Sequence, residues 1–344
     1  MVGMLVVVVV VVVVVEVVVL VAVVVVVVVI VLVVVEVVEE VVVVVVVVIV
    51  VVVVVAAAVV VVVVVVVAAA AAAAEAVPNT SAAASFTEEY RVSGSPWDTV
   101  DALSALSSFS DFAVGTGADF LNPYDHSMLF TGYDLSSVTE TGITLTTTGL
   151  AYTSTLCRTD GKSVSVVEDH GGFQSIDTAS HELGHSLSAK HDGEENLCRS
   201  TDRYIMAGGT FPQTDANLLN PWQFSVCSAN YFTTFITDEI RSTRGQYCLN
   251  FPLAVSASIP DVSDRLPGQE VSPDQQCAQI YGDSSRLCRG REFGDDICTA
   301  MFCFDPATVG TCYEQTAARG TTCGDGKLCI DGECVADPRA PAVD

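Results

Sequence analysis

The sequence predicts a mixed α/β (α+β) domain that is followed by a small disulfide-rich module. Short apolar strands and helical segments share the region from about residue 96 to 250. A histidine-rich block lies at His181–Asp192, within that region. All twelve cysteines occur from Cys157 onward, and eight of them fall in the last 68 residues. An even number of clustered cysteines predicts disulfides and an oxidising compartment.

The elements follow from hydrophobic periodicity and from chain-breaking residues. We expect a helix over residues 100–112 and strands over 127–132, 149–157 and 163–169. Gly171 and Gly172 then interrupt the chain before a helix for which Ser175 is the expected N-cap. That helix carries the histidine-rich block.

The block has the spacing of a zinc site. His181 and His185 are four residues apart, so on a helix both imidazoles project from the same face. Glu182 lies beside that face, where a carboxylate can take a proton from an activated water. His191 can join the pair only if the helix ends near Leu187 and the chain turns back. Three histidine ligands leave a fourth position open, as in catalytic zinc sites.

The alternative interpretation is two surface histidines of a helix with an ion-paired glutamate. The third histidine and the acid that follows it, Asp192, favour the metal site. His126 and His170 fall outside the zinc spacing, and we expect both to be structural or solvent-facing.

The block resembles the zinc signature of the metzincins, H-E-x-x-H-x-x-G-x-x-H, and Asp192 is typical of their reprolysin (adamalysin) branch. Residues 204–207 resemble the Met-turn of the family, with Met206 as its methionine. The resemblance implies a metzincin-like catalytic domain in which Glu182 is the general base and Asp192 supports the turn. The chain departs from the signature at Ser188, where the family usually has Gly in a sharp turn, at a cost of about 1 kcal/mol.

Further expectations come only from this resemblance. It implies an edge strand that pairs with substrate at 149–157 and a closing helix across 220–236. It implies disulfides Cys157–Cys248 and Cys198–Cys227, and it suggests Ca²⁺ ligands at Asp125, the Cys248 carbonyl and Asn250. Because the valine tract occupies the place of the first strand and helix of the family, we expect these two elements to be missing.

The carboxy-terminal cysteines predict a second module. Residues 277–335 contain eight cysteines, and 320–335 resemble the disintegrin-like, cysteine-rich module of ADAMTS proteases and tick salivary metalloproteases. A module of this size has too little apolar core to fold without crosslinks. The resemblance implies an exosite for protein substrates, and a plain structural cap is the alternative.

The amino-terminal tract, residues 1–77, consists almost entirely of valine and alanine. It is interpreted either as low complexity, from an expanded codon repeat or a faulty gene prediction, or as a hydrophobic segment. Residues 41–74 carry no charge and are long enough to enter a membrane as an anchor. No basic residues flank the tract, which argues against a signal peptide or a designed anchor.

The formal net charge of −26 excludes a nucleic-acid binder on electrostatic grounds. We expect a tract at 1–77, a linker at 78–95, a partial metalloprotease domain at 96–250, a linker at 251–276, a cysteine-rich module at 277–335 and a tail at 336–344. The predicted function is a secreted Zn²⁺-dependent endopeptidase that acts on extracellular proteins. The alternative is a catalytically impaired, disulfide-rich extracellular binding protein.

Overall fold

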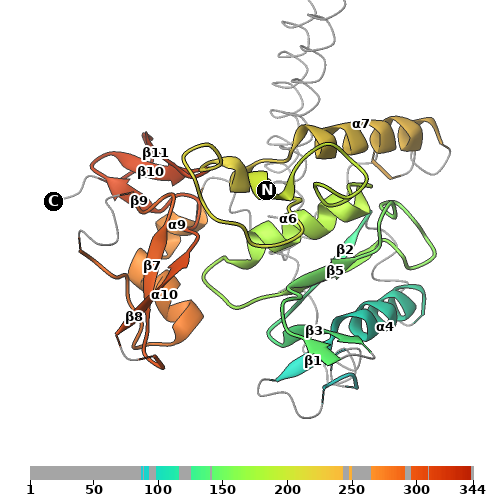
Figure 1. Ribbon diagram of the computed structural model, residues 1–344, viewed down its shortest axis with the longest axis horizontal. Helices are drawn as coiled ribbons and strands as arrows, with labels where there is room; N and C mark the ends of the chain where they lie inside the picture. The colour runs from blue at the N-terminus through green and yellow to red at the C-terminus, as the bar shows by residue number, and fades with distance from the viewer. Residues whose placement is uncertain are drawn as a thin grey trace, which may run out of the picture.

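The structure is a computed structural model, and it describes residues 87, 89–92, 98–115, 125–139, 142–242, 248–249, 265–290, 296–308 and 310–341. The expectations for residues 1–77, for most of the first linker and for Asn250 lie outside these residues. Figure 1 shows a larger lobe with helices on both sides of its strands and a smaller lobe made of the carboxy-terminal residues. Within the described residues, no helix has the length and apolar character that crossing a membrane requires.

The larger lobe is mixed α/β, as predicted. Its helices are α4 (Ala102–Val114), α6 (Ser175–Ser186) and α7 (Val226–Arg241). Its strands are β1 (Thr99–Asp101), β2 (Ser127–Thr131), β3 (Asp134–Thr139), β4 (Gly142–Thr144), β5 (Gly149–Ala151) and β6 (Val164–Glu168). They form two three-stranded sheets, ordered β1-β3-β4 and β2-β6-β5. Two short 3-10 helices, η2 (Ser200–Asp202) and η3 (Asn220–Trp222), precede α7.

Two expected elements are shorter or later than the sequence suggests. Strand β5 covers only the first three residues of the stretch 149–157, because the chain turns between residues 153 and 162. The closing helix begins at Val226 rather than at residue 220, since Asn220–Trp222 forms the separate helix η3. Both elements nevertheless occur in the predicted order.

Strand β6 is buried on both faces and divides the core of this lobe. It is the central strand of its sheet and runs parallel to one edge strand, β2, and antiparallel to the other, β5. Val164 and Val166 pack with the apolar face of α4, whereas Val167 packs with α6 and with Phe232 of α7. Because successive side chains of a strand point to opposite faces, one strand of apolar residues joins the two helical layers. Figure 1 shows α4 on one side of the strands and α6 and α7 on the other.

Two of the three α-helices of the larger lobe begin at a residue whose side chain caps the helix. The side chain of Asp101 accepts a hydrogen bond from the Ser104 amide at the start of α4, and Ser225 does the same for Ser228 at α7. The expected cap of α6 at Ser175 is wrong. The N-cap is Gln174, and the Ser175 hydroxyl donates to Asp169 instead. The reason is that Gly171–Gly172, with φ of 82° and 62°, turns the chain early enough for the helix to start at Ser175 itself.

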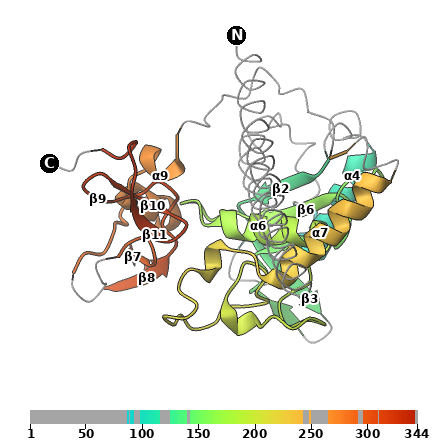
Figure 2. The ribbon, with the colours of Figure 1, turned by 90° about the horizontal axis from the view of Figure 1, so that it is seen from above.

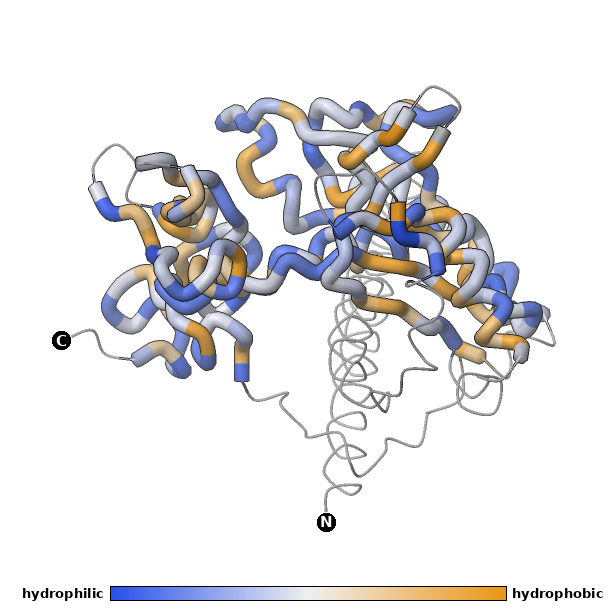
Figure 3. Tube along the Cα trace, turned by 90° about the horizontal axis from the view of Figure 1, so that it is seen from below, coloured by the Kyte–Doolittle hydropathy of each residue, from blue (hydrophilic) through white to orange (hydrophobic). Residues whose placement is uncertain are grey.

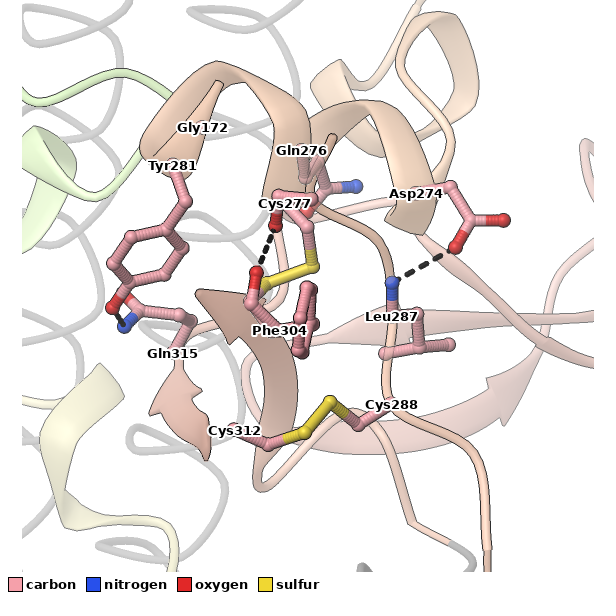
Figure 4. The surroundings of a disulfide bond; sticks show 12 residues. Gly172, Asp274, Gln276, Cys277, Tyr281, Leu287, Cys288, Phe304, Cys312 and Gln315 are labelled. Carbon is pink, nitrogen blue, oxygen red and sulfur yellow. Dashed lines mark hydrogen bonds between the residues drawn. A yellow bond between two sulfur atoms is a disulfide. The ribbon is translucent and has the colours of Figure 1, made fainter. Parts of the chain in front are cut away.

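The smaller lobe is held by four disulfides. It contains α9 (Pro267–Glu270), α10 (Pro273–Tyr281), β7 (Met301–Asp305), β8 (Thr311–Gln315), β9 (Thr322–Gly324), β10 (Lys327–Ile330) and β11 (Glu333–Ala336). The bonds join Cys277 to Cys303, Cys288 to Cys312, Cys298 to Cys329 and Cys323 to Cys334. Figure 4 shows the first two of these bonds beside α10 and the β7–β8 hairpin. Helix α9 and the start of α10 fall in the stretch 251–276, for which the sequence predicts a linker.

This lobe has no large apolar core within the described residues, and disulfide bonds and one buried side-chain amide hold it together instead. Its buried apolar cluster consists mostly of half-cystines, together with Met301 and Ala317. Figure 3 shows this lobe to one side of the larger lobe. Gln276 is fully buried, but its side chain bonds the Val271 carbonyl, the Thr321 hydroxyl and the Ala318 amide. Both polar atoms of the Gln276 amide are therefore satisfied, which removes the usual cost of burying it.

The two lobes touch at the start of α6. The Gln174 side chain donates to the Thr316 carbonyl at 2.8 Å and accepts from the Thr316 amide at 3.0 Å. A Cβ on Gly172 would lie 2.7 Å from Ile280 of α10, so the glycine permits close approach. At a second point, Trp222 packs over Gly332 in the β10–β11 turn. Figure 2 shows the smaller lobe beside the start of α6.

We expect Gln174→Ala to lower the free energy of unfolding by about 1–2 kcal/mol, because two hydrogen bonds between the lobes are lost. Urea denaturation measures the change. Gln223→Ala, which removes an exposed glutamine from the larger lobe, is the matched control. Equal stability of the two variants would contradict the role of the Gln174 contact.

The two histidines outside the zinc spacing have polar partners. His126 lies between the hydroxyls of Ser163 and Ser165, at 3.3 Å and 2.9 Å from its ring nitrogens. His170, at the end of β6, pairs with the buried carboxylate of Glu168 and is half exposed. Both positions agree with the expectation that these residues are structural or solvent-facing.

His170 supplies a pH-dependent contact. The second oxygen of Glu168 accepts from the Leu135 amide at 2.8 Å, so the carboxylate is held in place beside the imidazole. The hydrogen bond to Glu168 raises the pKa of His170 above its usual 6.5, and the nearby acids Asp134 and Asp169 add to this.

Because the folded state holds the proton of His170 more tightly, the stabilisation is complete below pH 6.5 and is lost as the pH rises through the folded-state pKa. We therefore expect His170→Gln to reduce stability by about 1 kcal/mol at pH 6 and by less at pH 9. Thermal melts of both proteins at the two pH values test this. An effect of equal size at both values would contradict it.

Candidate metal centre

Three imidazoles from two segments meet at one point. His181 and His185 project from the same face of α6, one turn apart, and His191 comes from the segment after the helix. The Nε2 atom of His191 lies 3.1 Å from Nε2 of His181 and 3.2 Å from Nε2 of His185. Ligands of a tetrahedral zinc ion at about 2.0–2.1 Å stand roughly 3.3 Å apart. The spacing of the nitrogen atoms therefore fits zinc.

The tautomers of the two helical histidines also fit a metal. The Nδ1 atom of His181 lies 2.7 Å from the Ile205 carbonyl, and Nδ1 of His185 lies 2.8 Å from the Ala189 carbonyl. A carbonyl only accepts, so each Nδ1 must carry the proton, and each Nε2 is left as a lone-pair donor. Burial lowers the pKa of His181 to about 4 and lowers that of His185, with the neighbouring histidines adding to the shift. Both rings are therefore neutral at pH 7, as metal ligands must be.

The reversal after α6 brings His191 back toward the helix. Leu187 ends the helix, and the Ser188 and Ala189 amides donate to the His185 and Gly184 carbonyls. Ser188 itself has φ of 83°, the left-handed conformation that glycine adopts most easily. Its hydroxyl accepts a hydrogen bond of 2.9 Å from Ser154, which follows the edge strand. The departure at Ser188 therefore leaves the turn intact, and a hydrogen bond offsets part of its strain.

Buried residues hold the far side of this turn. Asp192 is 1% exposed, accepts from the Ser225 hydroxyl at 2.6 Å and donates its amide to the Met206 carbonyl at 2.8 Å. Met206 is fully buried, and its sulfur lies 2.5 Å from the place that a Cβ on Gly184 would take. Position 184 must therefore be glycine, because the Met206 side chain fills the space that a Cβ would need. No spacing in the sequence identifies the roles of Gly184, Ser225 or the two carbonyl acceptors, which appear only in the folded chain.

Glu182 follows His181 on α6 and lies in unusual surroundings. It is 5% exposed, and its Oε2 atom has no hydrogen-bond partner in the described part of the chain. Burial raises the pKa of Glu182 to about 8, since a carboxylate loses hydration there. A buried carboxyl group with a free oxygen, next to a cluster of imidazoles, is typical of a catalytic site.

Two disulfides crosslink the lobe that contains the histidines. The other clusters of possible metal ligands in the described residues give no support for a second metal site. Cys157 bonds Cys248, and Cys198 bonds Cys227, which are the pairs implied by the resemblance. Elsewhere in the described residues, the groups with metal-ligand spacing consist largely of half-cystines, and Asp125 joins none of them. Calcium binding therefore stays a prediction from the resemblance alone.

Comparison with known proteins agrees with the site. Residues 104–192 match metallo-peptidase family M12B, reprolysin-like, and residues 267–335 match ADAMTS cysteine-rich domain 2. The larger lobe is thus reprolysin-like, and the smaller lobe is similar to an ADAMTS-type cysteine-rich module. The resemblance seen in the sequence is confirmed for both.

Individual relatives give the same result. The chain is 32% identical over 207 residues to a protein from Bombyx mori described as like a disintegrin and metalloproteinase with thrombospondin motifs, covering 56% of this chain and 27% of that protein. It is 34% identical to human member 15 of that group, covering 62% and 21%, and 36% identical to mouse member 7, covering 66% and 13%. The chain thus spans about a quarter or less of the length of these relatives.

The left-handed conformation of Ser188 leads to a testable prediction about stability and zinc binding. Ser188→Val should reduce stability by about 1–3 kcal/mol and weaken zinc retention, because a β-branched residue is strained at φ of 83°. Ser188→Gly loses the same hydroxyl without that strain, so it should keep zinc as the natural protein does. Thermal melts and competition with a chromophoric chelator measure the two effects. Equal zinc affinity in the valine and glycine variants would show that His191 does not depend on this turn.

Proposed function

We propose that the chain is a secreted zinc-dependent endopeptidase that cleaves extracellular proteins. The observation that carries the proposal is the set of three converging Nε2 atoms, with Glu182 buried next to the first of their residues. All twelve cysteines form disulfides, which agrees with an oxidising extracellular location. The reprolysin-like and ADAMTS-type matches support the same class of activity.

In this proposal His181, His185 and His191 hold Zn²⁺ through Nε2. When bound, zinc supplies Lewis acidity, which acidifies a water molecule and polarises a peptide carbonyl. The carbonyls of Ile205 and Ala189 keep the rings of His181 and His185 in the tautomer and orientation that binding needs. Asp192 and Met206 support the turn and the floor of the site without contacting the reacting atoms.

Glu182 acts as the general base. The positive charge of a bound zinc ion would favour the ionised form of Glu182 against the effect of burial. The carboxylate then takes the proton of the attacking water and delivers it to the nitrogen of the leaving amine. The unpartnered Oε2 atom supports this role, because no other group in the described residues competes for that oxygen. Burial supports it too, since proton transfer is more efficient where bulk water does not compete.

Strand β5 is the proposed docking place for the substrate backbone. It pairs only with β6 among the described strands, so its outer edge is open to an extended peptide. Such a peptide would add to the sheet as a further strand. The contact between the cysteine-rich lobe and the start of α6 supports a role for that lobe in binding longer protein substrates.

Replacement of the base tests the mechanism. We expect Glu182→Gln to reduce cleavage of casein by about 10²–10⁴-fold while one zinc per chain stays bound, because the ligands are untouched. Glu195→Gln, which alters an exposed glutamate in the loop after His191, is the matched control and should leave the rate unchanged. Metal analysis and a fluorescent casein assay give the two readouts.

Two outcomes would contradict this assignment. Full activity of Glu182→Gln would remove Glu182 as the base. Purification of the natural chain without one zinc per molecule would instead favour the alternative function, a disulfide-rich binding protein that lacks catalysis.

A further inference from the structure

Gly149, the first residue of edge strand β5, lies directly against the proposed catalytic base. A Cβ built on Gly149 would stand 2.7 Å from both Cγ and Oε1 of Glu182 and 2.8 Å from Cγ2 of Thr178. Non-bonded carbon atoms pack at about 3.5–4.0 Å, so none of these contacts could be accommodated without movement. The space that a side chain at position 149 would need is already filled by the glutamate and the threonine.

The backbone of Gly149 does not itself require glycine. Its φ lies outside the left-handed range, unlike that of eleven other glycines in the described residues. Gly149 is also paired in regular antiparallel register with Val167 of β6. Any residue could adopt this conformation, so the constraint at position 149 is space rather than backbone geometry.

A Cβ at position 149 would displace the Glu182 side chain and would also press on the methyl group of Thr178. Helix α6 is anchored by Ala179 and Leu183, which are buried in the main core, so the helix backbone has little freedom to shift. Nothing in the described residues bonds the Oε2 atom of Glu182. The direction of this carboxylate is therefore set largely by packing, and Gly149 and Thr178 form the wall of its slot.

We propose that Gly149 is a positioning residue for Glu182, so that the absence of a side chain on the edge strand holds the carboxylate in its catalytic orientation. This inference rests on the proposed function of Glu182. Side chains stand roughly perpendicular to a sheet, so a larger residue at 149 would press on α6 and leave the outer edge of β5 free for a peptide. The effect should fall on the chemical step and spare substrate binding.

The test is Gly149→Ala in the full chain. We expect kcat for peptide cleavage to fall at least tenfold, KM to change less than twofold, and one zinc per chain to remain bound. Gly132→Ala is the matched control, because a Cβ at Gly132 meets nothing within 4 Å. If Gly149→Ala binds zinc and keeps its kcat within twofold of the natural protein, the proposal is wrong.

A double variant separates the two contacts and covers the case in which Gly149→Ala does not fold. Gly149→Ala with Thr178→Ser removes the Cγ2 contact and retains the one with Glu182. We expect this protein to fold, to bind zinc and to stay at least tenfold slower than Thr178→Ser alone. Recovery of full activity would overturn the proposal, since Thr178 and not Glu182 would then be the constraint.

A binding measurement keeps this inference distinct from the proposed function. A peptide hydroxamate places a hydroxyl group beside the base while it chelates zinc, so its affinity reports on the position of Glu182 without turnover. We expect Kd to rise at least tenfold in Gly149→Ala and to stay unchanged in Gly132→Ala, even if the natural protein cleaves no substrate tested. Equal Kd values for the natural protein and Gly149→Ala would refute the positioning role.

Discussion

The reversal of the chain after α6 is the constraint on which the site depends. A helix places His181 and His185 together by its own periodicity, but it cannot place His191 there. Ser188 in a left-handed conformation makes the reversal, and the Ala189 carbonyl that follows bonds the ring of His185. The same turn therefore orients the imidazole of His185 and brings the imidazole of His191 next to it.

Burial keeps this turn in place. Asp192 and Met206 join the segment after His191 to the segment before α7, and Ser225 both caps α7 and bonds Asp192. The lobe is thus closed around the histidines by backbone and side-chain hydrogen bonds and by two disulfides. Ser225 bonds Asp192, and Asp192 directly follows His191 in the chain. We therefore expect a substitution at Ser225 to shift the position of His191 through Asp192.

The helix that carries the histidines also links the two lobes. Gln174 is the N-cap of α6 and bonds the backbone of Thr316 in the smaller lobe. On the other side, Gly149 brings the edge strand against Glu182. The helix is consequently in contact with the smaller lobe at its start and with the proposed substrate strand along its middle.

Local spacing indicated His181, His185 and Glu182, and hydrophobic periodicity indicated the strands β2 and β6, because these signals repeat within a few residues. His191 could be added from the sequence only on the condition that the chain turns back after the helix. The cap at Gln174, the helices α9 and α10 within an expected linker, and the closeness of Gly149 to Glu182 were decided only by the tertiary structure. The contact of Gly149 with Glu182 joins residues far apart in the chain, as does the contact of Gln174 with Thr316. Periodicity reports which face of an element is apolar, whereas only packing in three dimensions decides which atoms then compete for the same space.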